Sequence, residues 1–306
     1  MKEKTAFAIV VAVLIGLNLV ILVSAYPETM LVDSGCCAPS SVKLVKDFSA
    51  FYTAAWRLFH NPSDIYTPGI VHDGEYLLLP QPEAFKYLPS FLLIISPLLL
   101  LPYQGALTAF DIVQFLLLPL IAIMLYGLLK GRGLLTTSVV TAAVLLFPLP
   151  FLTPQFGLSL SYYWQWAEGQ SKVLDTFLLL LSFYLAKGGR PRLSGFVFAL
   201  GAFDPRFALL GLPVLAIYST KFKQSLLYAA GTLALLNLPL LYPLTAAGFL
   251  HMVFSSGIST SPTWYDFIPT AALVSLILVN HEKLSVMMMK RLNRGPSLAQ
   301  AQSSAP

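Results

Sequence analysis

The segment from Gln155 to Gln170 combines aromatic rings with amide side chains, a mixture that suits a sugar. The rings of Trp164 and Trp166 offer faces on which a pyranose can stack, and the Gln170 amide can donate hydrogen bonds to hydroxyl groups. Trp and Tyr are also common where helices meet the membrane interface. A sugar-binding loop and an interfacial aromatic belt therefore both fit this segment.

A second chemically notable site is Asp204-Pro205-Arg206, which interrupts an apolar stretch over residues 193–218. An ionisable side chain inside a membrane costs ~2.5–3.5 kcal/mol on insertion scales, which makes it a candidate functional residue. Alternatively, Asp204 and Arg206 pair with each other or reach the interface. Basic residues bound the stretch at both ends, so we expect two half-helices that meet at Asp204-Pro205.

A third candidate is Asp47, at the start of an amphipathic helix that ends at Asn61-Pro62. The helical period predicts one apolar stripe, with Phe51 and Leu58 beside it, formed by Phe48, Tyr52, Ala55 and Phe59. Such a helix would lie on a membrane surface, with Asp47 close to the lipid headgroups. Asp is also a frequent helix N-cap, so capping is the alternative role for Asp47.

The composition indicates a membrane protein. Of the 306 residues, 57% are apolar and only 11% are charged, against about 25% charged in soluble domains. The net charge of +5 does not indicate nucleic-acid binding, because the basic residues lie in short clusters between apolar runs, as in proteins whose helices are oriented across a membrane.

Apolar runs predict an all-α, polytopic membrane protein with about seven or eight transmembrane or half-membrane helices. The first run, about 6–25, follows a basic N-terminus, and a signal peptide is the alternative interpretation. An external loop over about 26–87 follows. The run 90–101 contains Pro97 and is short, so it either spans or is re-entrant; the positive-inside rule favours re-entry. Later spans are expected at 105–129, 134–152, 173–186, 225–241 and 267–279, around the two half-helices.

These runs predict one membrane domain over residues 1–294 and a disordered cytoplasmic tail over 295–306. In this topology both termini are cytoplasmic, and the loops containing Asp47 and Trp164 face outward.

The external loop carries a recognisable order of residues. Asp47-Phe48, Phe51-Tyr52, Ala54-Ala55 and Leu58 are followed by Tyr66-Thr67-Pro68. This order resembles the first external loop of GT-C integral-membrane glycosyltransferases, in particular the polyprenyl-phosphate-mannose-dependent mannosyltransferases. In that family the acid at this position is the proposed catalytic base, so the resemblance implies this role for Asp47.

The resemblance also implies how the donor is held. The family usually carries Lys-Pro at the helix break, whereas this chain has Asp204-Pro205 followed by a cation, Arg206. A guanidinium can bind phosphate oxygens with two hydrogen bonds, so Arg206 is the expected replacement. Further candidates are Lys86 and Lys172 for the donor phosphate and, for the sugar or acceptor, Tyr52, Trp164, Trp166, Gln170 and Asp204.

The expected activity is transfer of a sugar, mannose by resemblance, from a polyprenyl-phosphate donor to an acceptor glycan or lipid on the outer face. No cofactor is required, and no spacing demands a metal, although Asp33, Asp73 and Glu75 could approach Asp47. One alternative is a non-catalytic GT-C-like subunit of a larger membrane complex. Another is a small transporter, suggested by the broken helix with its ionisable residues.

Overall fold

The computed structural model describes residues 2–25, 46–67, 69–73, 76–81, 85–146, 166, 169–255, 267–283 and 286. At some positions, among them 69–73, 76–81 and Arg206, only the backbone is described. The predicted tail over 295–306 and the expected sugar-binding residue Trp164 lie outside the described residues. The division of the chain into domain and tail therefore remains a prediction.

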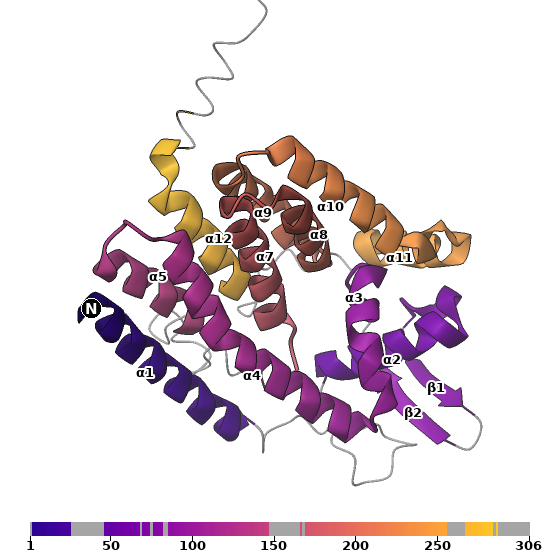
Figure 1. Ribbon diagram of the computed structural model, residues 1–306. Coiled ribbons are helices and arrows are strands. Elements are labelled where there is room, and N and C mark those ends of the chain that lie inside the picture. The colour runs from indigo at the N-terminus through magenta and orange to yellow at the C-terminus, as the bar shows by residue number, and fades with distance from the viewer. Residues whose placement is uncertain are drawn as a thin grey trace, which may run out of the picture.

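The described chain is mainly helical (Figure 1). Its helices are α1 (Lys2–Ala25), α2 (Lys46–His60), α3 (Pro89–Ile95), α4 (Tyr103–Leu128), α5 (Leu134–Leu146), α7 (Lys172–Lys187), α8 (Pro191–Gly201), α9 (Pro205–Tyr218), α10 (Phe222–Leu236), α11 (Pro243–Ser255) and α12 (Phe267–Val279). Short 3-10 helices are η2 (Pro62–Asp64), η3 (Ser96–Leu100) and η5 (Leu238–Leu241).

The described chain is predominantly helical, in agreement with the expected all-α fold, and the loop before α3 adds one antiparallel hairpin that the sequence analysis did not expect. Strand β1 (Gly69–Asp73) pairs with β2 (Tyr76–Gln81), and the register is irregular between Ile70 and His72. Ile70 and Val71 in β1 and Tyr76 in β2 have the β propensity that such a hairpin needs. The hairpin lies beside α2 (Figure 1).

Within the part of the chain that the structure describes, two helices, α1 and α4, are long and apolar enough to cross a membrane. Helix α1 packs against the rest of the bundle: the rings of Phe7 and Tyr126 are 4.9 Å apart. The side-chain amide of Asn18 also donates a 2.9 Å hydrogen bond to the carbonyl of Leu145 in α5. In the structure, α1 is therefore an integral part of the helical bundle.

The run predicted as spanning or re-entrant forms two short pieces. Helix α3 has seven residues and η3 has five. Leu88 is extended before Pro89, as expected for a residue that precedes proline. At ~1.5–2.0 Å of rise per residue, the two pieces together are shorter than the ~30 Å of hydrocarbon that a crossing requires.

Helices α8 and α9 are separated by the break expected at Asp204-Pro205. Helix α8 lies between α7 and α10 (Figure 1), and glycines allow the close approach. A Cβ atom on Gly201 would lie 2.9 Å from Cβ of Leu178 in α7. On the other side, a Cβ atom on Gly195 would lie 2.8 Å from Cβ of Tyr228 in α10. Small residues thus fix how tightly these helices pack, as is common in membrane bundles.

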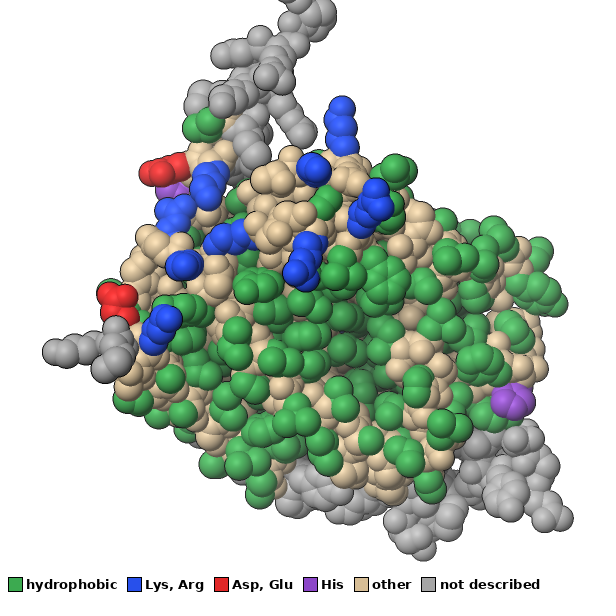
Figure 2. Space-filling model, in the orientation of Figure 1, with side chains coloured by type: hydrophobic (Ala, Val, Ile, Leu, Met, Phe, Trp, Pro, Cys, Tyr) green, Lys and Arg blue, Asp and Glu red, His purple; other side chains and the backbone are tan. Residues whose placement is uncertain are grey.

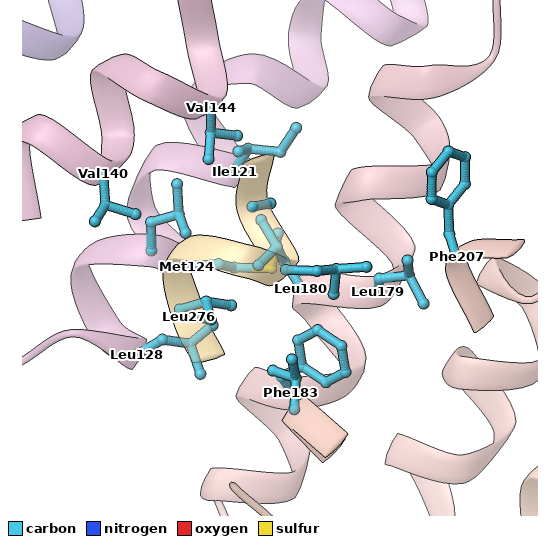
Figure 3. Close-up of a cluster of buried hydrophobic side chains, with 14 of the residues drawn as sticks. Ile121, Met124, Leu128, Val140, Val144, Leu179, Leu180, Phe183, Phe207 and Leu276 are labelled. Carbon is cyan, nitrogen blue, oxygen red and sulfur yellow. The ribbon is translucent and has the colours of Figure 1, made fainter. Parts of the chain in front are cut away.

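The buried apolar side chains form two clusters. The larger joins the C-terminal half of α4 to α5, α7, α9 and α12 (Figure 3). The smaller joins α2, α3 and the N-terminal half of α4, and includes Phe203. In α4 the smaller cluster ends at Phe110 and the larger begins at Leu118. Buried polar residues of α4 occupy the boundary between the two clusters.

Basic side chains gather along one edge of the molecule, at the top of Figure 2. Exposed basic residues lie at or near the ends of α4, α5, α7, α8, α9, α10 and α12, and we call them the basic edge: Lys130, Arg132, Lys187, Arg190, Arg192, Lys221, Lys223 and Lys283. Helix α2 and the β hairpin lie away from this edge, at the lower right of Figure 1. The face between them is largely hydrophobic (Figure 2).

Candidate active site

The centre of the site is an ion pair between Lys172 and Asp204. The ammonium nitrogen of Lys172 lies 3.2 Å from Oδ2 of Asp204, and the two side chains are 1% and 2% exposed. Lys172 is the first residue of α7, and Asp204 immediately precedes α9. The break between α8 and α9 therefore places a carboxylate where it neutralises the lysine at the start of α7.

Two aromatic rings lie close to the ammonium group of Lys172. It donates a 3.2 Å hydrogen bond to the hydroxyl of Tyr87 and lies 5.2 Å from the centre of that ring. The ring of Phe207 in α9 is 4.9 Å away. Both distances allow cation–π attraction. The backbone amide of Leu88 donates to the carbonyl of Phe203 at 2.9 Å, which fastens the segment containing Tyr87 to the helix break.

Helix α4 contributes Asp111 and Gln114, at the boundary between the two apolar clusters. The Gln114 amide donates a 2.8 Å hydrogen bond to the backbone carbonyl of Gln170, and both side chains are buried. Gln170 lies two residues before Lys172, so this bond ties α4 to the start of α7. Asp111 lies about one turn before Gln114 on the same side of α4.

Three buried polar atoms near this junction have no hydrogen-bond partner within the described part of the chain. They are Oδ1 of Asp111, Nε1 of Trp166 and Oγ of Ser171. Ser171 is the N-cap residue of α7, yet its hydroxyl makes no capping hydrogen bond. A buried polar atom without a partner costs about 1–3 kcal/mol, so a ligand that supplied the partners would gain affinity.

Helix α2 lies against this region through its apolar face. The ring of Phe48 is 5.1 Å from that of Phe110 in α4, and the ring of Phe51 is 5.5 Å from that of Tyr87. Asp47 precedes Phe48 and lies one turn before Phe51, with a partly exposed side chain. Two ring contacts thus connect the first turns of α2 with α4 and with the tyrosine that binds Lys172.

The predicted stripe on α2 needs a correction. Phe48 and Ala55 are buried as expected, but Phe51 and Leu58 complete the buried face. Phe59, expected in the stripe, is 60% exposed, whereas Leu58 beside it is buried. Asp47 is the second residue of α2 as described, not the residue before the helix.

Tyr52 is expected to contact the sugar or the acceptor, and in the structure its side chain forms contacts with other residues of the protein. Its hydroxyl donates a 2.8 Å hydrogen bond to the carbonyl of Leu101, and partial burial raises its pKa above the usual 10.0. Its ring also lies 5.6 Å from that of Tyr103. Tyr52 therefore joins α2 to the start of α4.

The other predicted residues fall into three groups. Gln170, Lys172, Asp204 and Trp166 are buried, and hydrogen bonds or an ion pair join the first three to neighbouring elements. Trp166 lies 6.4 Å from the ring of Phe115 in α4. Lys86 is exposed. Arg206 is in the first turn of α9, but its side chain lies outside the described residues.

Sequence analysis did not predict several residues of the candidate site where α4 meets the start of α7. Asp111 is the one acid in the apolar run at 105–129, and that isolation was a usable signal. Ser171, Gln114 and Tyr87 carry no comparable signal, because uncharged polar residues are tolerated in membrane helices and near their ends. Among the described residues, no group of three or more His, Cys, Asp or Glu side chains is placed to hold a metal ion.

Comparison with known proteins identifies the family. No curated protein and no solved structure significantly matches the chain. A sequence profile of glycosyltransferase family 87 matches residues 85–287, about two thirds of the chain. The match includes the Lys172–Asp204 pair, Tyr87 and Asp111 and stops short of Asp47. The chain therefore belongs to glycosyltransferase family 87, a family of membrane glycosyltransferases of GT-C type.

Proposed function

We propose that this membrane glycosyltransferase moves mannose from a polyprenyl-phosphate donor to an acceptor hydroxyl, on a glycan or a lipid, at the outer face of the cell membrane. The observation that carries the proposal is the buried junction of Lys172, Asp204 and Asp111, which lies beside the first turns of α2 within a bundle of apolar helices. A donor with a lipid tail can approach such a junction from the membrane.

In the proposed reaction, Asp47 is the general base. Its carboxylate takes the proton of the acceptor hydroxyl as the hydroxyl oxygen attacks the anomeric carbon. The new glycosidic C–O bond forms while the bond between the anomeric carbon and the phosphate oxygen breaks. The electron pair of that bond leaves with the polyprenyl phosphate. Asp47 is partly exposed, as a base that meets an incoming acceptor must be.

Lys172 is the proposed partner of the leaving phosphate, with Arg206 and Lys86 as further cations. The ammonium of Lys172 is paired with Asp204 in the structure. Phosphate oxygens are strong acceptors of charge-assisted hydrogen bonds, so they can compete with Asp204 for the same donor. The buried environment of Lys172 strengthens this interaction, because little water screens it.

The proposed orientation follows from the position of the charges. The basic edge contains basic residues at both ends of the α8–α9 pair and beside α5, α7, α10 and α12. Lys and Arg are enriched on the cytoplasmic side of membrane proteins. With this edge inside, α2 and Asp47 face outward, and both termini are cytoplasmic.

The test is transfer of labelled mannose from polyprenyl-phosphate-mannose to a membrane extract by the purified full chain in lipid nanodiscs. Three proteins are compared: wild type, Asp47→Asn and the control Asp64→Asn. Asp64 is in the same external segment, where Asn61 and Ser63 bind its carboxylate. Because general-base catalysis contributes about 10²–10⁴-fold, we expect Asp47→Asn to lower the rate at least about 100-fold and Asp64→Asn to retain most activity.

Both variants should keep the thermal unfolding midpoint of wild type, since the amide is nearly isosteric with the carboxylate. Absence of transfer by wild type from this donor would contradict the proposed reaction. Wild-type transfer that persists in Asp47→Asn would contradict the role of Asp47 alone.

A further inference from the structure

The polar atoms without a partner at the junction of α4 and α7 differ in hydrogen-bonding type. Oδ1 of Asp111 accepts when the carboxylate is ionised, Nε1 of Trp166 only donates, and the hydroxyl of Ser171 does both. The three residues are 6%, 2% and 0% exposed. The described part of the chain thus leaves a buried acceptor, a buried donor and a hydroxyl unsatisfied together.

These atoms belong to one face of α4 and to the segment that packs on it. Asp111 and Phe115 are four residues apart, so they lie on the same side of the helix. Phe115 contacts Trp166, with ring centres 6.4 Å apart. Between them, Gln114 binds the carbonyl of Gln170, the residue before Ser171. Both contacts lie one turn after Asp111 on its own side of α4, and they place Trp166 and the segment leading to Ser171 against that side of the helix.

The combination of an acceptor on Asp111, a donor on Trp166 and a hydroxyl on Ser171 indicates which class of ligand can satisfy all three atoms. An anion would satisfy the indole and the hydroxyl but would be repelled by Asp111. A lipid tail would satisfy none of them. A neutral polyol offers hydroxyl groups that donate to the carboxylate and accept from the indole, and an aromatic ring beside it can pack against the sugar's C–H face.

We infer that Asp111, with Ser171 and Trp166, binds the hydroxyl groups of the transferred sugar, an inference that rests on the proposed sugar transfer. Asp111 accepts from one or two hydroxyls, the Trp166 indole donates to another, and Ser171 completes the set beside Lys172. The sugar is thereby held next to the cation proposed for its phosphate. Asp111 is then a specificity-determining residue that takes no part in the bond changes.

Equilibrium binding of two ligands tests the inference. The full chain in nanodiscs is titrated with polyprenyl-phosphate-mannose and with polyprenyl phosphate, which lacks the sugar, and Kd is obtained from ligand-dependent thermal shifts. The variants are Asp111→Leu, Ser171→Ala and the control Thr141→Val. Thr141 is a buried polar residue of α5 whose hydroxyl bonds only within that helix, to the carbonyl of Thr137, in the described contacts.

We expect wild type to bind the mannose-bearing ligand more tightly than polyprenyl phosphate. Asp111→Leu should raise the Kd for polyprenyl-phosphate-mannose about 10-fold or more, the loss expected for a hydrogen bond to a charged group. The Kd for polyprenyl phosphate should change little, because that ligand has no sugar hydroxyls. Ser171→Ala should produce a smaller change of the same kind, and Thr141→Val none.

The unfolding midpoint of the ligand-free Asp111→Leu variant shows whether Asp111 acts in ligand binding or in packing. Oδ1 of Asp111 is buried and has no partner within the described part of the chain, so an apolar side chain of similar size should leave the unfolding midpoint of ligand-free protein unchanged or higher. If Asp111 were needed for packing, Asp111→Leu would lower that midpoint. Should this variant fail to fold, Asp111→Asn, which keeps the shape and loses the charge, takes its place in both measurements.

The outcomes distinguish the two proposals. If neither ligand binds wild type, the proposed polyprenyl-phosphate donor is wrong. If both bind and the variant at Asp111 keeps the wild-type preference for the mannose-bearing ligand, the proposed donor stands and the role of Asp111 is overturned.

Discussion

Lys172 and Asp204 form an ion pair across 3.2 Å, although 32 residues separate them in the sequence. The pair joins the start of α7 to the break between α8 and α9, and both side chains are almost completely buried. A buried pair of this kind gives little net stability over an apolar pair, whereas a single remaining charge is very unfavourable. Unfolding experiments should therefore show a large loss of stability when one charge is removed and a much smaller loss when both are removed.

Lys172→Met should destabilise the protein strongly, by about 3–5 kcal/mol, because it leaves the Asp204 carboxylate buried without its cation. Asp204→Leu should have a similar effect through the unpaired ammonium. The double variant should recover much of the loss, since no unpaired charge remains. Thermal unfolding in one detergent gives the four midpoints. Additive losses in the double variant would show that the two charges do not interact.

Tyr87→Phe tests the hydroxyl that accepts a hydrogen bond from Lys172. The ring, with its contacts to Phe51 and Phe91, is retained. Loss of a bond to a charged donor should cost about 1.5–3 kcal/mol, seen as a lower unfolding midpoint. Tyr184→Phe is the control, because Tyr184 is also in the bundle but is 44% exposed. Equal midpoints for the two variants would argue against the bond.

Gly195→Ala should lower the unfolding midpoint clearly, because α8 and α10 meet at this glycine. The new Cβ atom would clash with the backbone carbonyl of Ser225 and lie 2.8 Å from Cβ of Tyr228. Overpacking typically costs about 1–3 kcal/mol, and backbone atoms cannot yield as a flexible side chain can. A midpoint at or above that of wild type would contradict the close approach of the two helices.

Gly231→Ala is the matched control for that substitution. Gly231 lies in α10, and an added Cβ atom would meet nothing within 4 Å. Alanine is the better helix former by about 1 kcal/mol, so this variant should be as stable as wild type or more so. The contrast between the two glycines isolates the effect of helix packing.

The local elements of this fold were predictable from the sequence, and the reason differs from one to the next. The break at Asp204-Pro205 was visible because an acid and a proline interrupt an apolar stretch. Helix α2 was visible from its period and from Asn61-Pro62 at its end. The β hairpin was missed although Ile70-Val71 and Tyr76-Leu77 carry a local β signal, because the whole loop was interpreted as polar and helical.

The contacts of the candidate site were not predictable in the same way. The sequence left Asp204 as a functional candidate, or as a residue that pairs with Arg206, whose side chain lies outside the described residues, or reaches the interface. The partner that the structure describes is Lys172. That partner depends on how α7 packs beside the α8–α9 break, and no local pattern records such tertiary contacts. The grouping of Asp111 with Trp166 and Ser171 has the same origin. The sequence thus identified ionisable residues in apolar segments as candidates, whereas the packing of the helices determined which residues they contact.

Arg57→Met should loosen the segment that follows α2. Arg57 is 5% exposed and donates through Nη1 to the carbonyls of Asp64, at 3.0 Å, and Thr67. Burial lowers the pKa of Arg57 and the nearby Asp64 carboxylate opposes this shift, so the guanidinium stays charged at neutral pH. The substitution removes the charged donor from both carbonyls, at a cost of about 1.5–3 kcal/mol.

Hydrogen exchange over residues 61–67 is the measurement for this substitution, and it should be faster in Arg57→Met than in wild type. Arg57→Lys should lie between them, because an ammonium retains the charge but lacks the planar fork of donors. Since α2 also contains Asp47, a looser end of this helix should reduce sugar transfer less than Asp47→Asn does, without abolishing it. Unchanged exchange in Arg57→Met would mean that other contacts hold this segment against α2.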